Sequence, residues 1–182
     1  MKGEAQSARG NNKRVEDGPA GSMEAVLLIN FQGTKEMSEK SEHLVPLPLV
    51  GVRTSFSRQI TETDIELFAQ VSSDHNPIHL DHEYAVRTPF GGRIAHGLLI
   101  ASMISAVLGN QLPGPGSIYL GQTLKFLAPV RIDDIITVNV EVIAVREEKR
   151  IITLRTDCTN QQGVLVLSGE ATIKYMRTIH EG

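Results

Sequence analysis

The chain is poor in the residues that several classes of protein depend on. Its 182 residues include no tryptophan and only 4% aromatic residues, so a surface that stacks nucleic-acid bases is not expected. The net charge of -3 gives no basic surplus for binding phosphates. A single cysteine, Cys158, excludes an internal disulfide framework and a zinc site built from cysteines. We therefore expect neither a nucleic-acid-binding protein nor a disulfide scaffold.

The sequence also lacks an apolar stretch as long as a membrane span. The longest apolar-rich segment, 97–108, is too short and carries two serines. The first residues do not show the charged-then-apolar pattern of a secretory signal. Together with ordinary hydrophobic (41%) and charged (21%) fractions, this predicts a soluble globular protein without a membrane partner. We expect it in the cytoplasm, or in the mitochondrial matrix if the source is eukaryotic.

Two parts of the chain differ in their patterns. Residues 1–44 mix glycine, asparagine and charges without a period, so we expect a mostly disordered N-terminal extension of unknown purpose. Within it, only 25–29 is apolar enough to form a strand or a short docking element. Regular patterns begin at Val45, and they predict one domain over 45–178.

The first half of this domain is expected to be helical apart from one strand. A helix should begin after Thr61 and end before Asp74, because the residue before Pro77 and its neighbours are driven out of the helical region. Its capping pair is either Thr61 with Asp64 or Thr63 with Glu66. The expected elements are a strand at 52–57, this helix, a short helix at 81–87, a loop at 88–92, and a helix at 97–108.

The second half reads as four strands joined by short turns. They are expected at 118–128, with a bulge at Gly121, and then at 137–142, 150–159 and 163–175. Such a series predicts an antiparallel meander. The 97–108 helix is apolar on nearly all sides and should be covered on most of them. We predict an α+β fold in which an antiparallel sheet wraps around one long buried central helix.

The densest cluster of polar residues lies at 72–82, between two expected helices. Asp74 and His79 are five residues apart, and Pro77 stiffens the link between them. A carboxylate and an imidazole that face one pocket can serve as a base and an acid. Taken alone, the motif favours a more ordinary interpretation: Asp74 forms a turn with the backbone, and His79 is a hydrogen-bonded core residue.

A metal site is a further interpretation of the same cluster. Three histidines could join Asp74, Asp81 and the distant His96 as ligands. However, a proline turn separates His75 from His79, and neither a zincin nor a deaminase spacing is present. We expect no metal and no other cofactor.

A second feature is the segment Ile94–Gly97, at the start of the apolar helix. The first backbone N–H groups of a helix are unpaired, and Gly97 has no side chain to block an approaching oxygen. The site would suit the oxyanion of a thioester enolate. In the alternative interpretation, Gly97 merely permits close packing and His96 forms a local hydrogen bond.

Four segments together resemble the MaoC-like (R)-specific enoyl-CoA hydratases. The resemblance implies a hotdog fold, usually as a homodimer, and reversible addition of water to a trans-2-enoyl thioester to give an (R)-3-hydroxyacyl thioester. Asp74 and His79 match the family's catalytic pair, and Gly97 matches the glycine whose N–H holds the thioester oxygen. The matching segments are 68–79, 90–97, 112–122 and 126–130, within a region of about 46–176.

The resemblance also implies how the reaction runs and what binds. Asp74 takes a proton from water as its oxygen attacks C3, and His79 protonates C2 on the same face. Ser105 and Leu108 match positions that line the acyl pocket, and we expect Asn76 and His96 to contact substrate. The expected substrate is a short or medium enoyl-CoA or an enoyl-acyl carrier protein.

One departure from the family and two other functions remain open at this stage. The family commonly has glycine just before the aspartate, where this chain has Ser73. The first alternative function is a hotdog acyl-CoA thioesterase, which would attack the thioester carbon. The second is an acyl-CoA-binding hotdog without enzymatic activity, although such a protein has no need of both Asp74 and His79.

Overall fold

The computed structural model describes residues 27–29, 35–37 and 45–176. The chain divides into two compact units, Met1–Ser41 and Glu42–Gly182. In the first unit, β1 (Leu27–Ile29) pairs antiparallel with β2 (Lys35–Met37). Part of the apolar 25–29 segment is thus a strand, and residues 1–26, 30–34 and 38–44 of the expected extension lie outside the described residues.

The second unit is built on an antiparallel sheet, as the sequence predicted. A register shift between Tyr119 and Gly121 supplies the predicted bulge. β5 (Lys125–Phe126) pairs with β8 beside the main path of the sheet. The main path runs in the order β3 (Arg53–Gln59), β6 (Ile135–Arg146), β7 (Ile151–Thr159), β8 (Leu165–Tyr175) and β4 (Ser117–Gln122).

Alternation along the strands puts one face of the sheet into the core. On β6, four alternating side chains are at most 1% exposed: Ile136, Val138, Val140 and Val142. Cys158 belongs to the matching inward face of β7, and burial raises the pKa of its thiol to about 12, with a further contribution from Asp157. This cysteine is therefore a core residue with an unreactive thiol.

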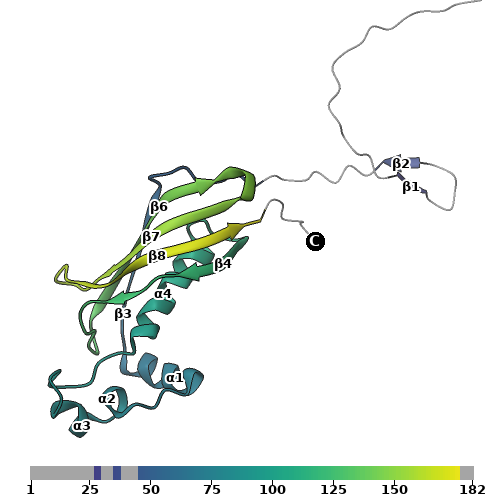
Figure 1. The fold of residues 1–182 in the computed structure, drawn as a ribbon. Helices are drawn as coiled ribbons and strands as arrows, with labels where there is room; N and C mark the ends of the chain where they lie inside the picture. Colours follow the sequence, from purple (N-terminus) through teal and green to yellow (C-terminus); the bar gives the residue numbers. More distant parts are fainter. Residues whose placement is uncertain (1–26, 30–34, 38–44, 177–182) are drawn as a thin grey trace, which may run out of the picture. The chain divides into compact units, whose positions relative to one another are not determined.

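The long helix α4 (Gly97–Asn110) lies against the sheet (Figure 1). The face that it buries consists of Leu99, Ile100, Met103, Ile104, Val107 and Leu108. The opposite face leaves Leu98, Ser102 and Ser105 exposed. Within the described residues the sheet covers the buried face of α4, which is thus the long central helix that the sequence predicted. No helix in the described part of the chain is long and apolar enough to cross a membrane.

Three shorter helices gather at one end of the sheet (Figure 1): α1 (Glu62–Ser72), α2 (Pro77–Leu80) and α3 (His82–Val86). The first of the two predicted capping pairs is the one that forms, because Thr61 and Asp64 exchange side-chain-to-backbone hydrogen bonds. A 3₁₀ turn, η1 (Glu147–Lys149), joins β6 to β7.

Helix α2 was not predicted, since 72–82 was read as a loop between helices. Its signal is nevertheless in the sequence. The Asn76 side chain accepts from the Ile78 N–H at 3.2 Å, and Pro77 occupies the first helical position. Proline is favoured there because its missing N–H would have no partner in any case.

Candidate functional site

The segment between α1 and α2 carries Asp74. Helix α1 ends at Ser73, whose φ of 61° is left-handed, a conformation that glycine adopts more easily. This explains why a glycine suits the position before the aspartate. Asp74 Oδ1 then accepts from the Asn76 N–H at 3.2 Å, so the expected turn does form. The turn occupies one carboxylate oxygen and leaves the other available for chemistry.

His79 lies on α2 with its ring fixed at one edge. Its Nδ1 lies 2.8 Å from the Ile94 carbonyl oxygen. A carbonyl oxygen only accepts, so Nδ1 carries the hydrogen and Nε2 is left for other partners. His79 is therefore hydrogen-bonded and half-buried, as the ordinary interpretation expected, and its Nε2 is still available for another partner.

The main chain of His79 is held as firmly as its ring. Arg93 Nε donates to the His79 carbonyl at 2.8 Å, and Arg93 Nη1 pairs with Glu62 at the start of α1. The Arg93 side chain is only 12% exposed. Arg93 thereby connects α2 to α1, a role that was not predicted from the sequence.

Burial lowers the pKa of His79 from its ordinary 6.5. The hydrogen bond to Ile94 opposes this change, the nearby His96 adds to it, and the Asp74 charge opposes it. The net lowering favours the neutral ring near pH 7, in which Nε2 is a hydrogen-bond acceptor.

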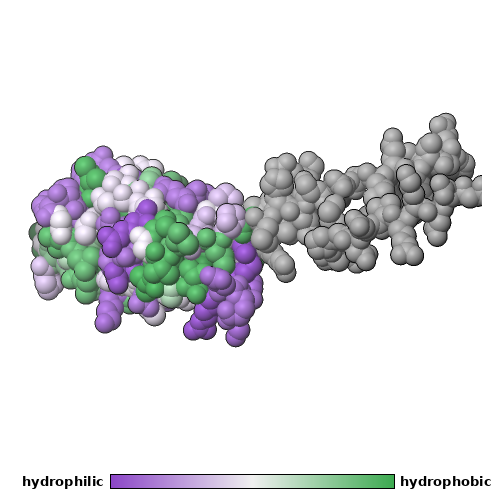
Figure 2. All heavy atoms as spheres, turned by 90° about the horizontal axis from the view of Figure 1, so that it is seen from above, coloured by the Kyte–Doolittle hydropathy of each residue, from purple (hydrophilic) through white to green (hydrophobic). Residues whose placement is uncertain are grey.

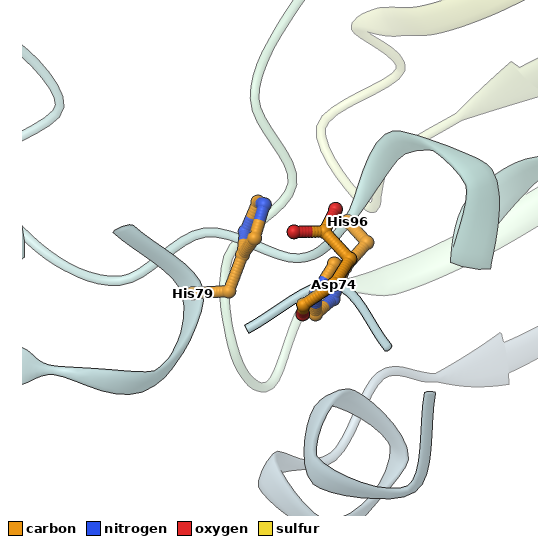
Figure 3. Close-up of side chains that lie close together, drawn as sticks. All are labelled: Asp74, His79 and His96. Atoms are coloured by element: carbon orange, nitrogen blue, oxygen red, sulfur yellow. The ribbon is translucent and has the colours of Figure 1, made fainter. Parts of the chain in front are cut away.

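His96 joins the group from the start of α4, and Figure 3 shows its side chain close to Asp74 and His79. Its Nε2 donates to the Asp74 carbonyl at 3.0 Å. The rings of His79 and His96 are stacked, with centroids 3.8 Å apart and planes inclined by 31°. His96 is 2% exposed, so it offers little surface to a substrate.

Gly97 is the first residue of α4, where a helix has unpaired N–H groups. A Cβ added at Gly97 would lie 2.7 Å from Cε1 of Phe126. Close packing is thus one reason for glycine here. It does not exclude the oxyanion role, since a residue without a side chain also leaves more room for a carbonyl oxygen near the N–H groups at the helix start.

These groups border one cavity of about 570 Å³. Asp74, His79, His96 and Gly97 all line it, whereas Asn76 does not. Three phenylalanines that line this cavity, Phe68, Phe90 and Phe126, were not predicted to do so. They are far apart in the chain, so their positions in the sequence do not show that they come together. The apolar lining includes Phe68, Phe90, Leu98, Ile100, Phe126, Leu127, Val166 and Leu167.

The two residues expected to line the acyl pocket lie farther along α4. Ser105 is exposed on the uncovered side of the helix, and Leu108 is 1% exposed in the core. Neither borders the cavity that the described residues enclose. Asn76 caps α2 instead of facing the cavity.

Within the described residues, Asp74, His79 and His96 each place one ligand-type atom within 4.8 Å of the others. In each ring one nitrogen is bonded to a backbone carbonyl, which leaves the other nitrogen of the ring for further partners. The arrangement can take up, hold and release a proton beside a site that binds a carbonyl oxygen.

Comparisons with known proteins agree with this fold. A family model described as "MaoC like domain" matches residues 48–163. The chain is 52% identical to an (R)-specific enoyl-CoA hydratase from Rhodospirillum rubrum, over 68% of this chain and 85% of that protein. It is 39% identical to a mitochondrial 3-hydroxyacyl-[acyl-carrier-protein] dehydratase from Arabidopsis thaliana, over 64% of this chain and 70% of that protein.

A solved structure gives the same result for the fold. The (R)-hydratase from Aeromonas caviae aligns with a TM-score of 0.69 at 46% identity, covering 71% of this chain and 98% of its own. The antiparallel sheet and α4 correspond to the hotdog fold of such proteins. The chain therefore belongs to the MaoC-like family of hotdog-fold enoyl-CoA hydratases and dehydratases.

Proposed function

We propose that this protein adds water reversibly to trans-2-enoyl thioesters, giving (R)-3-hydroxyacyl thioesters. The observation that carries the proposal is the placement of Asp74 and His79 on one cavity beside the N-terminus of α4. Relatives about 50% identical are named for this reaction. The protein would accordingly be a hydro-lyase that works with its own side chains.

The tautomer of His79 refines the roles of the pair. In the neutral ring Nε2 carries a lone pair, because Nδ1–H is committed to Ile94. His79 therefore first accepts a proton from the water whose oxygen attacks C3, and then gives that proton to C2 on the same face. The Asp74 carboxylate orients the water and stabilises the imidazolium, so it need not be the final proton carrier. One proton leaves water and one reaches C2, so the step balances.

The N-terminus of α4 supports the thioester during this step. The Gly97 N–H would donate to the carbonyl oxygen, which gains negative charge as the enolate forms. The cavity is mostly apolar beyond this point, which suits an acyl chain. General acid–base catalysis contributes roughly 10²–10⁴-fold, and an oxyanion donor roughly a further 10²–10³-fold.

The cavity and the relatives support a proposal for the substrate carrier and chain length. We propose CoA thioesters with a short or medium acyl chain as the principal substrates. Acyl carrier protein thioesters are the second choice, because a relative named for them is less similar. Ser105 lies about 12 Å along the helix from Gly97, so Ser105 and Leu108 stay predictions as contacts of a longer chain. Asn76 likewise stays a prediction as a substrate contact.

We also propose that the protein works as a homodimer. The edge strand β4 exposes three consecutive large side chains, Ile118, Tyr119 and Leu120, by 48%, 39% and 55%. Figure 2 shows hydrophobic patches on the described surface, of the kind that association covers. The cytoplasmic location expected from the sequence stays a prediction, which cell fractionation would test.

The test uses the full chain with trans-2-butenoyl-CoA. We expect loss of the conjugated thioester absorbance and a product that is (R)-3-hydroxybutyryl-CoA by chiral analysis. Free CoA, detected with a thiol reagent, would instead indicate the thioesterase. Cys158 should not disturb that assay, because its thiol is buried with a pKa of about 12. Tight binding without turnover would indicate the non-enzymatic alternative.

A further inference from the structure

His96 is a buried histidine whose contacts point to a role of its own. It occupies the N-cap position of α4, yet its side chain makes no capping hydrogen bond. Its Nε2–H donates to the Asp74 carbonyl, and its Nδ1 has no hydrogen-bond partner among the described residues. The ring therefore sits in the core at the cost of an unpaired acceptor, which favours a function other than capping.

The first partner of His96 is an exposed stretch of main chain. Residues 72–77 are all exposed, and the Asp74 N–H bonds only locally, to Ser72 Oγ at 3.2 Å. The bond from His96 connects this stretch to α4, which lies 22 residues farther along the chain. It fixes the main chain from which the Asp74 carboxylate projects.

The second partner is the ring of His79. One edge of that ring is held by Ile94, and one face is covered by His96 at 3.8 Å. Phe68 approaches the His96 ring in turn, with centroids 5.0 Å apart and planes inclined by 52°. His96 thus touches both members of the acid–base pair while being only 2% exposed itself.

We propose that His96 is a positioning residue, which fixes the distance between the Asp74 carboxylate and His79 Nε2. It does so by holding the main chain of Asp74 and the ring face of His79 at the same time. The inference rests on the proposed hydration, and it replaces the substrate contact expected for His96 from the sequence. A water molecule that must reach both groups depends on this distance, and a misplacement of about 1 Å can cost roughly 100-fold in rate.

The two contacts can be removed separately. His96→Gln keeps an amide donor for the Asp74 carbonyl and removes the stacked ring, whereas His96→Phe keeps a ring and removes the donor. We expect each variant to lower kcat roughly 10- to 100-fold while KM changes less than about threefold. His82→Gln and His82→Phe are the matched controls, since His82 is exposed on α3, and they should keep wild-type kcat and KM.

A double variant separates positioning from general loss of structure. If His96 acts through the pair, His96→Gln should cost little further activity in an Asp74→Asn background. Ile104→Val, a buried change elsewhere on α4, should lower thermal stability without lowering kcat. The proposal would be overturned if the losses in activity of His96→Gln and Asp74→Asn added fully in the double variant. It would also be overturned if the His96 variants lowered kcat no more than Ile104→Val does.

A measurement on the unmodified protein covers the case in which the variants do not fold. Nitrogen-15 NMR of labelled histidine should show His96 as the Nε2–H tautomer and His79 as the Nδ1–H tautomer. His96 protonated at Nδ1 alone would contradict the inferred bond to Asp74. If the wild type hydrates enoyl-CoA and Asp74→Asn does not, but the His96 variants keep normal kcat, then only the role of His96 is wrong. If the wild type itself hydrates nothing, the proposed function is wrong.

Discussion

The sheet and the segment 72–80 are held together by different means. On β6, β7 and β8, inward side chains are buried within one apolar cluster, so each contributes through many contacts. In 72–80, the chain is mostly exposed and is fixed by individual hydrogen bonds, among them those that the side chains of Ser72, Asp74 and Asn76 accept from backbone N–H groups. Stability and activity therefore depend on separate parts of this molecule, so single substitutions should affect one without the other.

The largest effect on activity is expected for Asp74→Asn. The rate should fall roughly 10²–10⁴-fold, because the amide cannot stabilise an imidazolium at His79. The free energy of unfolding should change by less than about 1 kcal/mol, because an amide oxygen can still accept from the Asn76 N–H. Enoyl-CoA hydration and thermal unfolding of the same preparation check both expectations.

Asp81→Asn is the control for this variant. Asp81 also accepts from a backbone N–H, that of Tyr84 at 2.9 Å, but it does not line the cavity. Its variant should keep activity within about twofold. Similar losses in the two variants would show that the turn, and not the carboxylate, matters at Asp74.

In the sheet, we expect a substitution to lower stability and to leave activity unchanged. Leu154→Ala removes a fully buried side chain of β7 and should destabilise the fold by about 2–5 kcal/mol. The kcat per folded molecule should stay near the wild-type value, because Leu154 does not border the cavity. Denaturant titration and activity at low temperature check this, with Leu49→Ala, at a side chain that is 77% exposed, as the neutral control. A large fall in kcat per folded molecule would contradict the claim that stability and activity depend on separate parts of the molecule.

Gly97→Ala tests the point where the two regions meet. The added Cβ would displace Phe126 and narrow the approach to the helix N-terminus. We expect kcat/KM to fall roughly 10- to 100-fold, at or below the cost of losing an oxyanion donor. Gly109→Ala lies on the same helix, and its new Cβ would meet no atom within 4 Å apart from its chain neighbours and the backbone of its own helix, so it should keep full activity. Equal behaviour of the two variants would remove Gly97 from the site.

The pH dependence should report His79. Its pKa is lowered by burial, so kcat/KM should rise with pH through a midpoint below 6.5, as the ring becomes a free acceptor. The free energy of unfolding should change with pH in the same direction. As the pH falls, His79 takes up a proton in the unfolded chain before it does so in the folded protein. The contribution of His79 to stability is therefore present above pH 6.5 and is lost as the pH falls below it. In His79→Gln the remaining activity should no longer show this rise of kcat/KM with pH. A midpoint above 6.5 would disagree with the buried, neutral ring.

The smallest effect is expected at Ser73. Its left-handed φ of 61° is a conformation that costs roughly 1–2 kcal/mol for residues with a Cβ. Ser73→Gly should therefore raise the free energy of unfolding by about 1 kcal/mol or less, with unchanged activity. Ser55→Gly, in the extended strand β3, should lower it instead. A loss of stability in Ser73→Gly would mean that the serine side chain does more than the structure shows.

Local patterns in the sequence were enough to predict most of the fold. The alternation of β6, the bulge at Gly121 and the helix start near Thr61 depend on neighbouring residues, and all three appear in the structure. Of the two capping pairs left open by the sequence, Thr61 with Asp64 is the one that forms. The helix α2 was missed because proline was read only as a stiff link. Its place after Asn76 is in fact typical of a helix start.

The site was predictable only in part, for a physical reason. Asp74 and His79 are close in sequence, so one motif contains both. The contacts of His96 with them, and of Phe126 with Gly97, join residues that are far apart in the chain. Such contacts depend on the packing of α4 against the sheet, which residue spacing does not reveal.

The central claim is that one pair of side chains adds water and a proton from the same side of the substrate. Hydration of a trans-2-enoyl-CoA in deuterium oxide tests it most directly. We expect an (R)-3-hydroxyacyl-CoA with a single deuterium at C2, on the same face as the new hydroxyl group. Deuterium on the opposite face, or an (S) product, would contradict the account.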